Sequence, residues 1–239
     1  MKNRFILPAV IIGVCAIIVA FILARGLKNI KSDQTINVTG SAKQLIISDL
    51  GILKGFFNIE APTAQDAYRE LSRQRPLVVQ FLKSKGFKDA DIDLKTINVY
   101  PQYNFSSNGQ QLGVRAYTIN QSLEVSSKDV NKIKEISIAI ASLFEQGLNF
   151  NVNAPEYYYT KLSDVKVDIQ AAAAKDAMIR GEKVAEATNR SLGTLTNARM
   201  GVLQITPENS NMTSDYGIND VSSIRKEITA VVNANFEIE

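Results

Sequence analysis

The chain of 239 residues is 45% hydrophobic, with 27 basic residues, 24 acidic residues, no histidine and a single cysteine, Cys15. This composition is that of a folded protein, and the length suffices for one large domain or two small ones. The lack of histidine excludes Ser-His-Asp and Cys-His catalysis as well as His-ligated metal sites. A single cysteine also excludes a disulfide within the chain.

The first hydrophobic stretch begins at Ile6 and ends at Ala24, and it holds no charged, amide or hydroxyl side chain. As a helix it would span roughly 28 Å, close to the hydrocarbon thickness of a bilayer. We therefore expect residues 1–32 to be a membrane anchor with a tether and residues 33–239 to be the folded domain. A cleavable signal peptide is the alternative interpretation, although its apolar core is usually shorter.

Basic residues flank the apolar stretch on both sides and account for the positive net charge of the chain: Lys2, Arg4, Arg25, Lys28 and Lys31. The positive-inside rule is therefore nearly balanced and leaves the orientation open. Because the rest of the chain has no basic surplus, we expect no nucleic-acid partner. The lipid bilayer is the partner that the stretch from Ile6 to Ala24 predicts.

The first half of the folded domain begins with two predicted strands, over residues 35–42 and 44–60, with Gly40 as a turn residue at the end of the first. An apolar stripe at helical spacing predicts a helix over residues 63–85, with a kink or break near Arg75 because Pro76 follows. Gly86 would end this helix. Long strands over residues 91–104 and 112–125 flank an Asn-Gly turn signal, so we expect them to pair as a hairpin.

The second half begins with a predicted helix over residues 128–146 and a strand over 148–160. A long helix over 164–191, stopped by Gly193, precedes strands over 194–206 and 224–238, which a polar loop joins. The order is ββαββαβαββ. Hairpins between helices indicate an α+β domain with antiparallel or mixed sheets, in one or two lobes.

The long helix carries alanines at positions 171, 174, 177, 185 and 187 and is followed by Leu192 and Gly193. Together with the opening segment INVTGSA, Asp91-Ile92 after the first helix and the closing segment ITAVVNANFEI, this resembles the SIMPL-domain family of bacterial envelope proteins over residues 34–239. The resemblance implies an envelope or periplasmic domain without established enzymatic activity, a link to stress tolerance, and oligomeric assembly. Independently, small residues spaced three and four apart predict close approach of another helix or a sheet.

Two groups of side chains are candidate sites. Asp89, Asp91 and Asp93 alternate as at the start of a calcium loop, but Leu94 occupies the position of the turn glycine, so we expect solvated carboxylates and no metal site. Tyr157, Tyr158 and Tyr159 form the candidate interaction surface. Packing is the alternative explanation, because neighbouring strand residues point to opposite faces. No glycine-rich phosphate-binding motif is present, so we predict neither catalytic residues nor a cofactor.

We therefore expect a non-enzymatic, single-pass protein of the bacterial inner membrane whose C-terminal domain lies in the periplasm. Homo-oligomeric assembly with a structural, scaffolding or stress-related role is the first hypothesis. The alternative is a tethered binding module that captures a peptide, a lipid or a partner protein.

Overall fold

The computed structural model describes residues 13, 17–22 and 35–239. The expected membrane anchor, from Ile6 to Ala24, lies mostly outside these residues. No helix among the described residues is both long and apolar enough to span a membrane.

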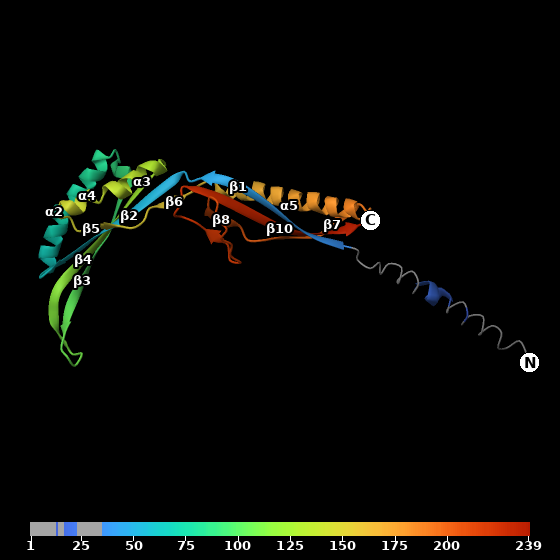
Figure 1. The fold of residues 1–239 in the computed structure, drawn as a ribbon. Helices are drawn as coiled ribbons and strands as arrows, with labels where there is room; N and C mark the ends of the chain where they lie inside the picture. The colour runs from blue at the N-terminus through green and yellow to red at the C-terminus, as the bar shows by residue number, and fades with distance from the viewer. Residues whose placement is uncertain (1–12, 14–16, 23–34) are drawn as a thin grey trace, which may run out of the picture. The chain divides into compact units, whose positions relative to one another are not determined.

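The described chain folds as an α+β protein with two five-stranded sheets (Figure 1), which confirms the α+β class expected from the sequence. It divides into two compact units. Of the described residues after residue 34, unit 1 comprises 35–42, Ile169–Gly201 and Ala230–Glu239, and unit 2 comprises Lys43–Asp168 and Val202–Thr229.

The sheet of unit 2 has the order β3-β4-β2-β5, with β6 also pairing with β2. Its strands are β2 (Leu50–Ala61), β3 (Ile92–Phe105), β4 (Gln111–Ser127), β5 (Phe150–Val152) and β6 (Glu156–Tyr158). β2 and β4 pair antiparallel without interruption. β3 and β4 form the predicted hairpin, whose turn contains Gly109 with a φ of 78°. β3 is therefore an edge strand of this sheet.

Helices α2 (Ala64–Ser84), α3 (Val130–Ala139) and α4 (Ser142–Glu145) cover one face of the unit 2 sheet (Figure 1). A short 3-10 turn, η1 (Asp89–Asp91), leads into β3. Burial of apolar area stabilises the layer between helices and sheet. The largest buried side chains there include Leu53, Phe57, Leu71, Leu82, Ile119, Ile133 and Phe150.

Three sequence expectations in unit 2 need correction. Of the kink or break expected near Arg75, the break does not occur, because α2 continues through Pro76; Leu71, Gln74 and Val78 around the proline are buried and hold the helix in place. The helix expected over 128–146 is divided into α3 and α4, where the Ser142 hydroxyl donates to the Ala139 carbonyl. The strand expected over 148–160 is divided into β5 and β6, because Pro155 between them cannot donate to a ladder.

The other sheet has the order β1-β10-β8-β9, with β7 also pairing with β10. Its strands are β1 (Thr35–Ile47), β7 (Leu192–Met200), β8 (Gln204–Pro207), β9 (Ile218–Asn219) and β10 (Arg225–Ile238). Within unit 1, β7 pairs antiparallel with β10. Within unit 2, β8 pairs antiparallel with β10 and parallel with β9.

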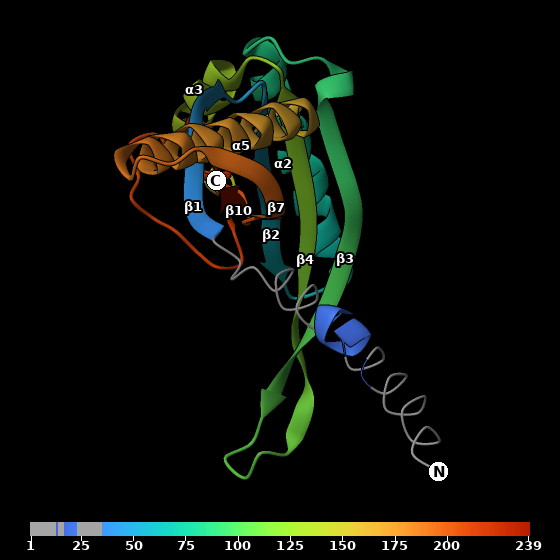
Figure 2. The ribbon, with the colours of Figure 1, turned by 90° about the vertical axis from the view of Figure 1, so that its right-hand side faces the viewer.

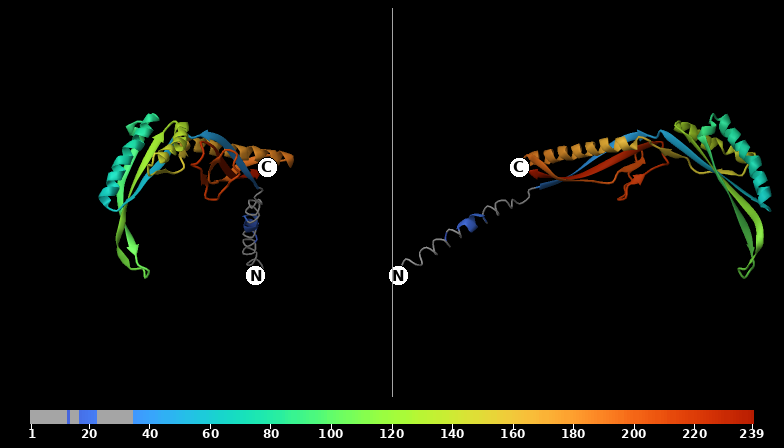
Figure 3. Two further views of the ribbon diagram at one scale, coloured as in Figure 1. Left: turned by 60° about the vertical axis from the view of Figure 1, so that its left-hand side comes forward. Right: turned by 180° about the vertical axis from the view of Figure 1, so that it is seen from behind.

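Helix α5 (Leu162–Ala187) runs along the strands of unit 1 (Figure 3). Small residues form its contact with these strands. In unit 1 it buries every fourth residue from Ile169 to Ala185, a series that includes Ala173 and Ala177. A Cβ at Gly40 would lie only 2.3 Å from the Ala173 carbonyl oxygen and the Ala177 nitrogen. The expectation that Gly40 forms a turn is therefore wrong: it lies inside β1, where its lack of a side chain lets the helix approach.

The remaining corrections concern the bounds of elements. β1 runs on to Ile47 and β2 begins at Leu50, because β1 does not turn at Gly40. α5 ends at Ala187, followed by Asn189 with a φ of 56°, and Gly193 lies within β7 instead of stopping the helix. The strand expected over 194–206 is divided into β7 and β8.

Candidate interaction surfaces

The tyrosines predicted as an interaction surface lie at β6 and just after it. Tyr157 pairs in register with Gly51 and is 4% exposed, as part of the apolar core of unit 2. Tyr158 and Tyr159 are half-buried. The Tyr158 hydroxyl donates to a Glu156 carboxylate oxygen at 2.6 Å, and this hydrogen bond raises the pKa of Tyr158. The tyrosines therefore do not present one shared exposed face.

Lys226 lies beside these tyrosines and is 2% exposed. Its Nζ donates to the carbonyl oxygen of Tyr157 at 2.6 Å and to the carbonyl oxygen of Asp220. Burial lowers the pKa of Lys226. The hollow that these residues line has a volume of only about 80 Å³, far below the several hundred cubic ångströms of an ordinary ligand pocket. Through these two hydrogen bonds, Lys226 therefore connects β10 to β6 and to the loop that precedes β10.

The aspartates of the calcium-like pattern each bind a neighbour on the chain. The Asp91 carboxylate accepts from the Lys88 backbone N–H at 2.8 Å, Asp89 pairs with Lys83 at 2.6 Å, and Asp93 pairs with Lys95. Among the described residues, no cluster of three or more acidic or cysteine side chains could hold a metal ion.

The β3–β4 hairpin has exposed apolar side chains on one face. Tyr103 pairs in register with Val114, and Val99, Tyr103 and Phe105 share a face because alternate residues of a strand point the same way. Their exposed fractions are 47% for Val99, 39% for Tyr103, 64% for Phe105 and 45% for Val114. We call these residues the apolar hairpin face. Figure 2 shows the end of the hairpin extending away from α2 and α3.

The opposite face of the hairpin is uncharged and mostly polar, although it also carries Tyr100, which is 51% exposed. It carries Asn98, Gln102 and Asn104, and the Gln102 amide donates to the Thr118 hydroxyl at 3.1 Å. No charged residue occurs from Thr96 to Val114. Exposed apolar patches commonly mark interaction sites, and proteins usually protect exposed edge strands with charges. The hairpin lacks that protection along most of its length.

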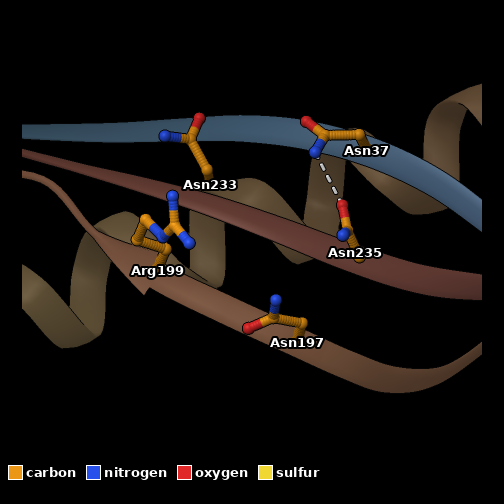
Figure 4. A pocket seen from close by; sticks show the side chains of 5 residues that line it. All are labelled: Asn37, Asn197, Arg199, Asn233 and Asn235. Carbon is orange, nitrogen blue, oxygen red and sulfur yellow. Dashed lines mark hydrogen bonds between the residues drawn. The ribbon is translucent and has the colours of Figure 1, made fainter.

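A second surface lies in unit 1, on the sheet face that α5 does not cover. Asn37 of β1, Asn233 and Asn235 of β10, and Asn197 and Arg199 of β7 line a hollow of about 400 Å³ (Figure 4). We call these residues the amide face. The strand register brings them together, because Asn233 pairs with Arg199 and Asn235 with Asn197.

The amide face presents more hydrogen-bond donors than acceptors. The Asn37 amide donates to Asn235 Oδ1 at 2.6 Å, and the Thr39 hydroxyl donates to Asn233 Oδ1 at 2.7 Å. These bonds occupy the side-chain oxygens of Asn233 and Asn235, whose side-chain N–H groups have no partner among the described residues. No described carboxylate pairs with Arg199. The surface can therefore hydrogen-bond a ligand that offers carbonyl and carboxylate oxygens.

The sequence carries signals for the buried Lys226, the amide face and the apolar hairpin face, although the expected elements and sites did not include them. On β10, residues 228, 230, 232, 234 and 236 are apolar and buried on one face, and Lys226 continues the same series. A lysine in line with an apolar face is the signal for a buried charge. The alternating Asn233 and Asn235 on the other face, and the charge-free hairpin, are likewise visible in the sequence.

Comparison with known families gives one finding. A family model described as "SIMPL: Protein of unknown function (DUF541)" matches residues 36–236. No curated protein matches the chain.

Proposed function

Because the chain belongs to the SIMPL family, we propose that it is a non-enzymatic, membrane-anchored envelope protein whose folded domain assembles into a homo-oligomer with a structural, scaffolding or stress-related role. The observation that carries this proposal is the exposed apolar hairpin face. Solvent exposure of such side chains is unfavourable, and association with another molecule removes it.

The proposed anchor is the apolar stretch from Ile6 to Ala24, which would hold the protein in the bacterial inner membrane as a single-pass protein. Its length and lack of polar side chains support this assignment. The folded domain would then lie in the periplasm, as the resemblance to envelope proteins also implies.

The proposal of a non-enzymatic role is supported by the composition. Histidine is absent and the only cysteine, Cys15, lies within the proposed anchor, so the usual bases and thiol nucleophiles at neutral pH are missing.

The first test is the mass of the full-length protein in mild detergent, measured by size-exclusion chromatography with light scattering beside a fragment beginning at residue 33. Assemblies of equal subunit number in both samples would support self-association of the folded domain. An assembly seen only with the full-length protein would assign association to the anchor instead. Monomers in both samples at micromolar concentration would contradict the proposal.

A tethered binding module is the second candidate function, and the amide face favours it. Asparagines two residues apart on a strand are separated by about 6.8 Å, which matches the repeat of alternate peptide units in an extended chain. A captured peptide with a carboxylate could pair bidentately with Arg199.

This second function predicts that an array of extended peptides binds through Arg199. Binding of acidic members should fall at least fivefold in Arg199→Ala, with the melting temperature unchanged because Arg199 is exposed. Lys175→Ala, which removes an equal charge from exposed α5, is the matched control and should bind as the native chain does. Equal losses in both variants would indicate nonspecific charge attraction.

A further inference from the structure

We propose that the apolar hairpin face packs against the same face of a second copy of this chain. This inference rests on the proposed function, because it names the surface through which the homo-oligomer forms. Val99, Tyr103 and Phe105 of β3 and Val114 of β4 would be buried in the contact.

The lack of charge favours a second copy as the occupant. In a two-fold contact the same patch occurs on both partners, so residues near the axis approach their own copies. A charged residue there would meet a like charge, which is unfavourable. The stretch from Thr96 to Val114 contains none, so the face is electrostatically compatible with itself.

The charges that flank the hairpin argue against a lipid surface as the occupant. Attraction to anionic headgroups depends on accessible basic side chains. The nearest ones are Lys95, which pairs with Asp93, and Arg115, which pairs with Glu60 at 3.0 Å. Both are already neutralised by carboxylates of this chain.

The two faces of the hairpin fit this arrangement. Packing would remove the apolar hairpin face from water, while the other face, with Asn98, Gln102 and Asn104 around Tyr100, would stay exposed. Side chains on the inner faces of two packed sheets interdigitate in this way.

Neighbouring residues on opposite faces of β3 provide a matched test. Tyr103→Lys places a charge on the apolar hairpin face. Asn104→Lys places the same charge at the next residue of β3, whose side chain lies on the opposite face of the hairpin. Both side chains are exposed, so neither variant should change the melting temperature of the monomer. We expect Tyr103→Lys to raise the concentration needed for assembly of the full-length chain at least tenfold and Asn104→Lys to leave it unchanged.

Chemical cross-linking gives a second, independent readout. In a Cys15→Ser background the chain has no other cysteine, so Tyr103→Cys or Asn104→Cys introduces a single thiol. A short bismaleimide should convert the Tyr103→Cys protein to covalent dimers and leave the Asn104→Cys protein largely monomeric on a denaturing gel.

The outcomes separate this inference from the proposed function. If the native chain assembles and Tyr103→Lys assembles equally well, the domain self-associates elsewhere and only the inference is wrong. Equal disruption by both lysine variants would point to pairing along the β3 edge and overturn the face assignment. The third outcome is a monomeric native chain that binds anionic vesicles in a flotation assay, with binding lost in Tyr103→Lys. This result would overturn both the proposed homo-oligomer and the inferred contact in favour of a lipid partner.

Discussion

At the scale of single residues, a buried glutamine connects α2 to the segment before β5. Gln74 is fully buried, its amide N–H donates to Glu70 at 2.6 Å, and its oxygen accepts from the Asn149 backbone N–H at 2.7 Å. Glu70 also accepts hydrogen bonds from Arg73. The hydrogen bond from Arg73, followed by that from Gln74, lowers the pKa of Glu70 to about 2.

This network predicts an acid-dependent contribution to stability. Because the folded-state pKa of Glu70 is about 2 and its ordinary value is 4.5, the contribution is present above pH 4.5 and is lost as the pH falls toward 2. Glu70→Gln cannot titrate. The melting temperature of the native chain should therefore exceed that of Glu70→Gln near neutrality by more than it does near pH 2. A constant difference across this pH range would contradict the assignment.

Gly40 is the second residue whose role depends on a distant part of the chain. In Gly40→Ala the new Cβ would lie 2.3 Å from backbone atoms of α5, so the helix must shift. We expect destabilisation by about 3 kcal/mol or more, at the upper end of overpacking effects, measured by urea denaturation. Gly201→Ala is the control, because its Cβ would meet the Val231 oxygen at an ordinary 3.4 Å. Equal effects of both substitutions would contradict the close approach.

The sequence could not have predicted either role. A glycine between two alternating segments has the same local pattern whether it forms a turn or makes room for a helix. The partners that distinguish the two cases, Ala173 and Ala177, lie far along the chain. Gln74 likewise reads as one more polar helix residue, and only the position of Asn149 explains its burial.

At the scale of elements, β10 depends on Lys226 at its beginning. Lys226→Met would keep much of the buried volume but leave the carbonyl oxygens of Tyr157 and Asp220 without this donor. Because buried acceptors without partners are costly, we expect a loss of about 2 kcal/mol or more in unfolding free energy.

Lys43→Met provides the comparison for this prediction. Lys43 is 60% exposed and pairs with Glu227 at 2.7 Å, and surface ion pairs of this kind contribute about 1 kcal/mol or less. If Lys226→Met loses no more unfolding free energy than Lys43→Met does, the hydrogen bonds of Lys226 to β6 and to the loop before β10 do not stabilise the fold.

Elements were predictable in proportion to their length. The hairpin β3–β4, helix α2 and strand β10 follow their sequence periodicity closely, because each has a long face against the core or a strong turn signal. The sequence pattern does not resolve the short strands β5, β6, β8 and β9 as separate elements. Their positions depend on pairing with β2 and β10, and stretches of two to four residues are too short to show a period.

At the scale of the whole molecule, the α+β class and the family follow from the sequence, whereas the candidate surfaces required the fold. Tyr157, Tyr158 and Tyr159 are predicted as an interaction surface because they are aromatic, yet Tyr157 lies in the core. The amide face combines residues of β7 and β10 with Asn37 of β1, which lies more than a hundred positions earlier, and only the pairing of β1 and β7 with β10 brings them together. The apolar hairpin face was hidden because strand patterning alone does not reveal which apolar face is covered.

The proposed localisation of the whole protein can be tested through its cysteine content. Cys15 is the only cysteine, so Ser107→Cys in a Cys15→Ser background places a single thiol at the exposed turn of the hairpin. If the anchor from Ile6 to Ala24 exports the domain, a membrane-impermeant maleimide should label this thiol in cells whose outer membrane alone is permeabilised. Labelling that needs disruption of the inner membrane would place the domain in the cytoplasm and contradict the proposed localisation. The unsubstituted Cys15→Ser protein controls for background, since it should remain unlabelled under either condition.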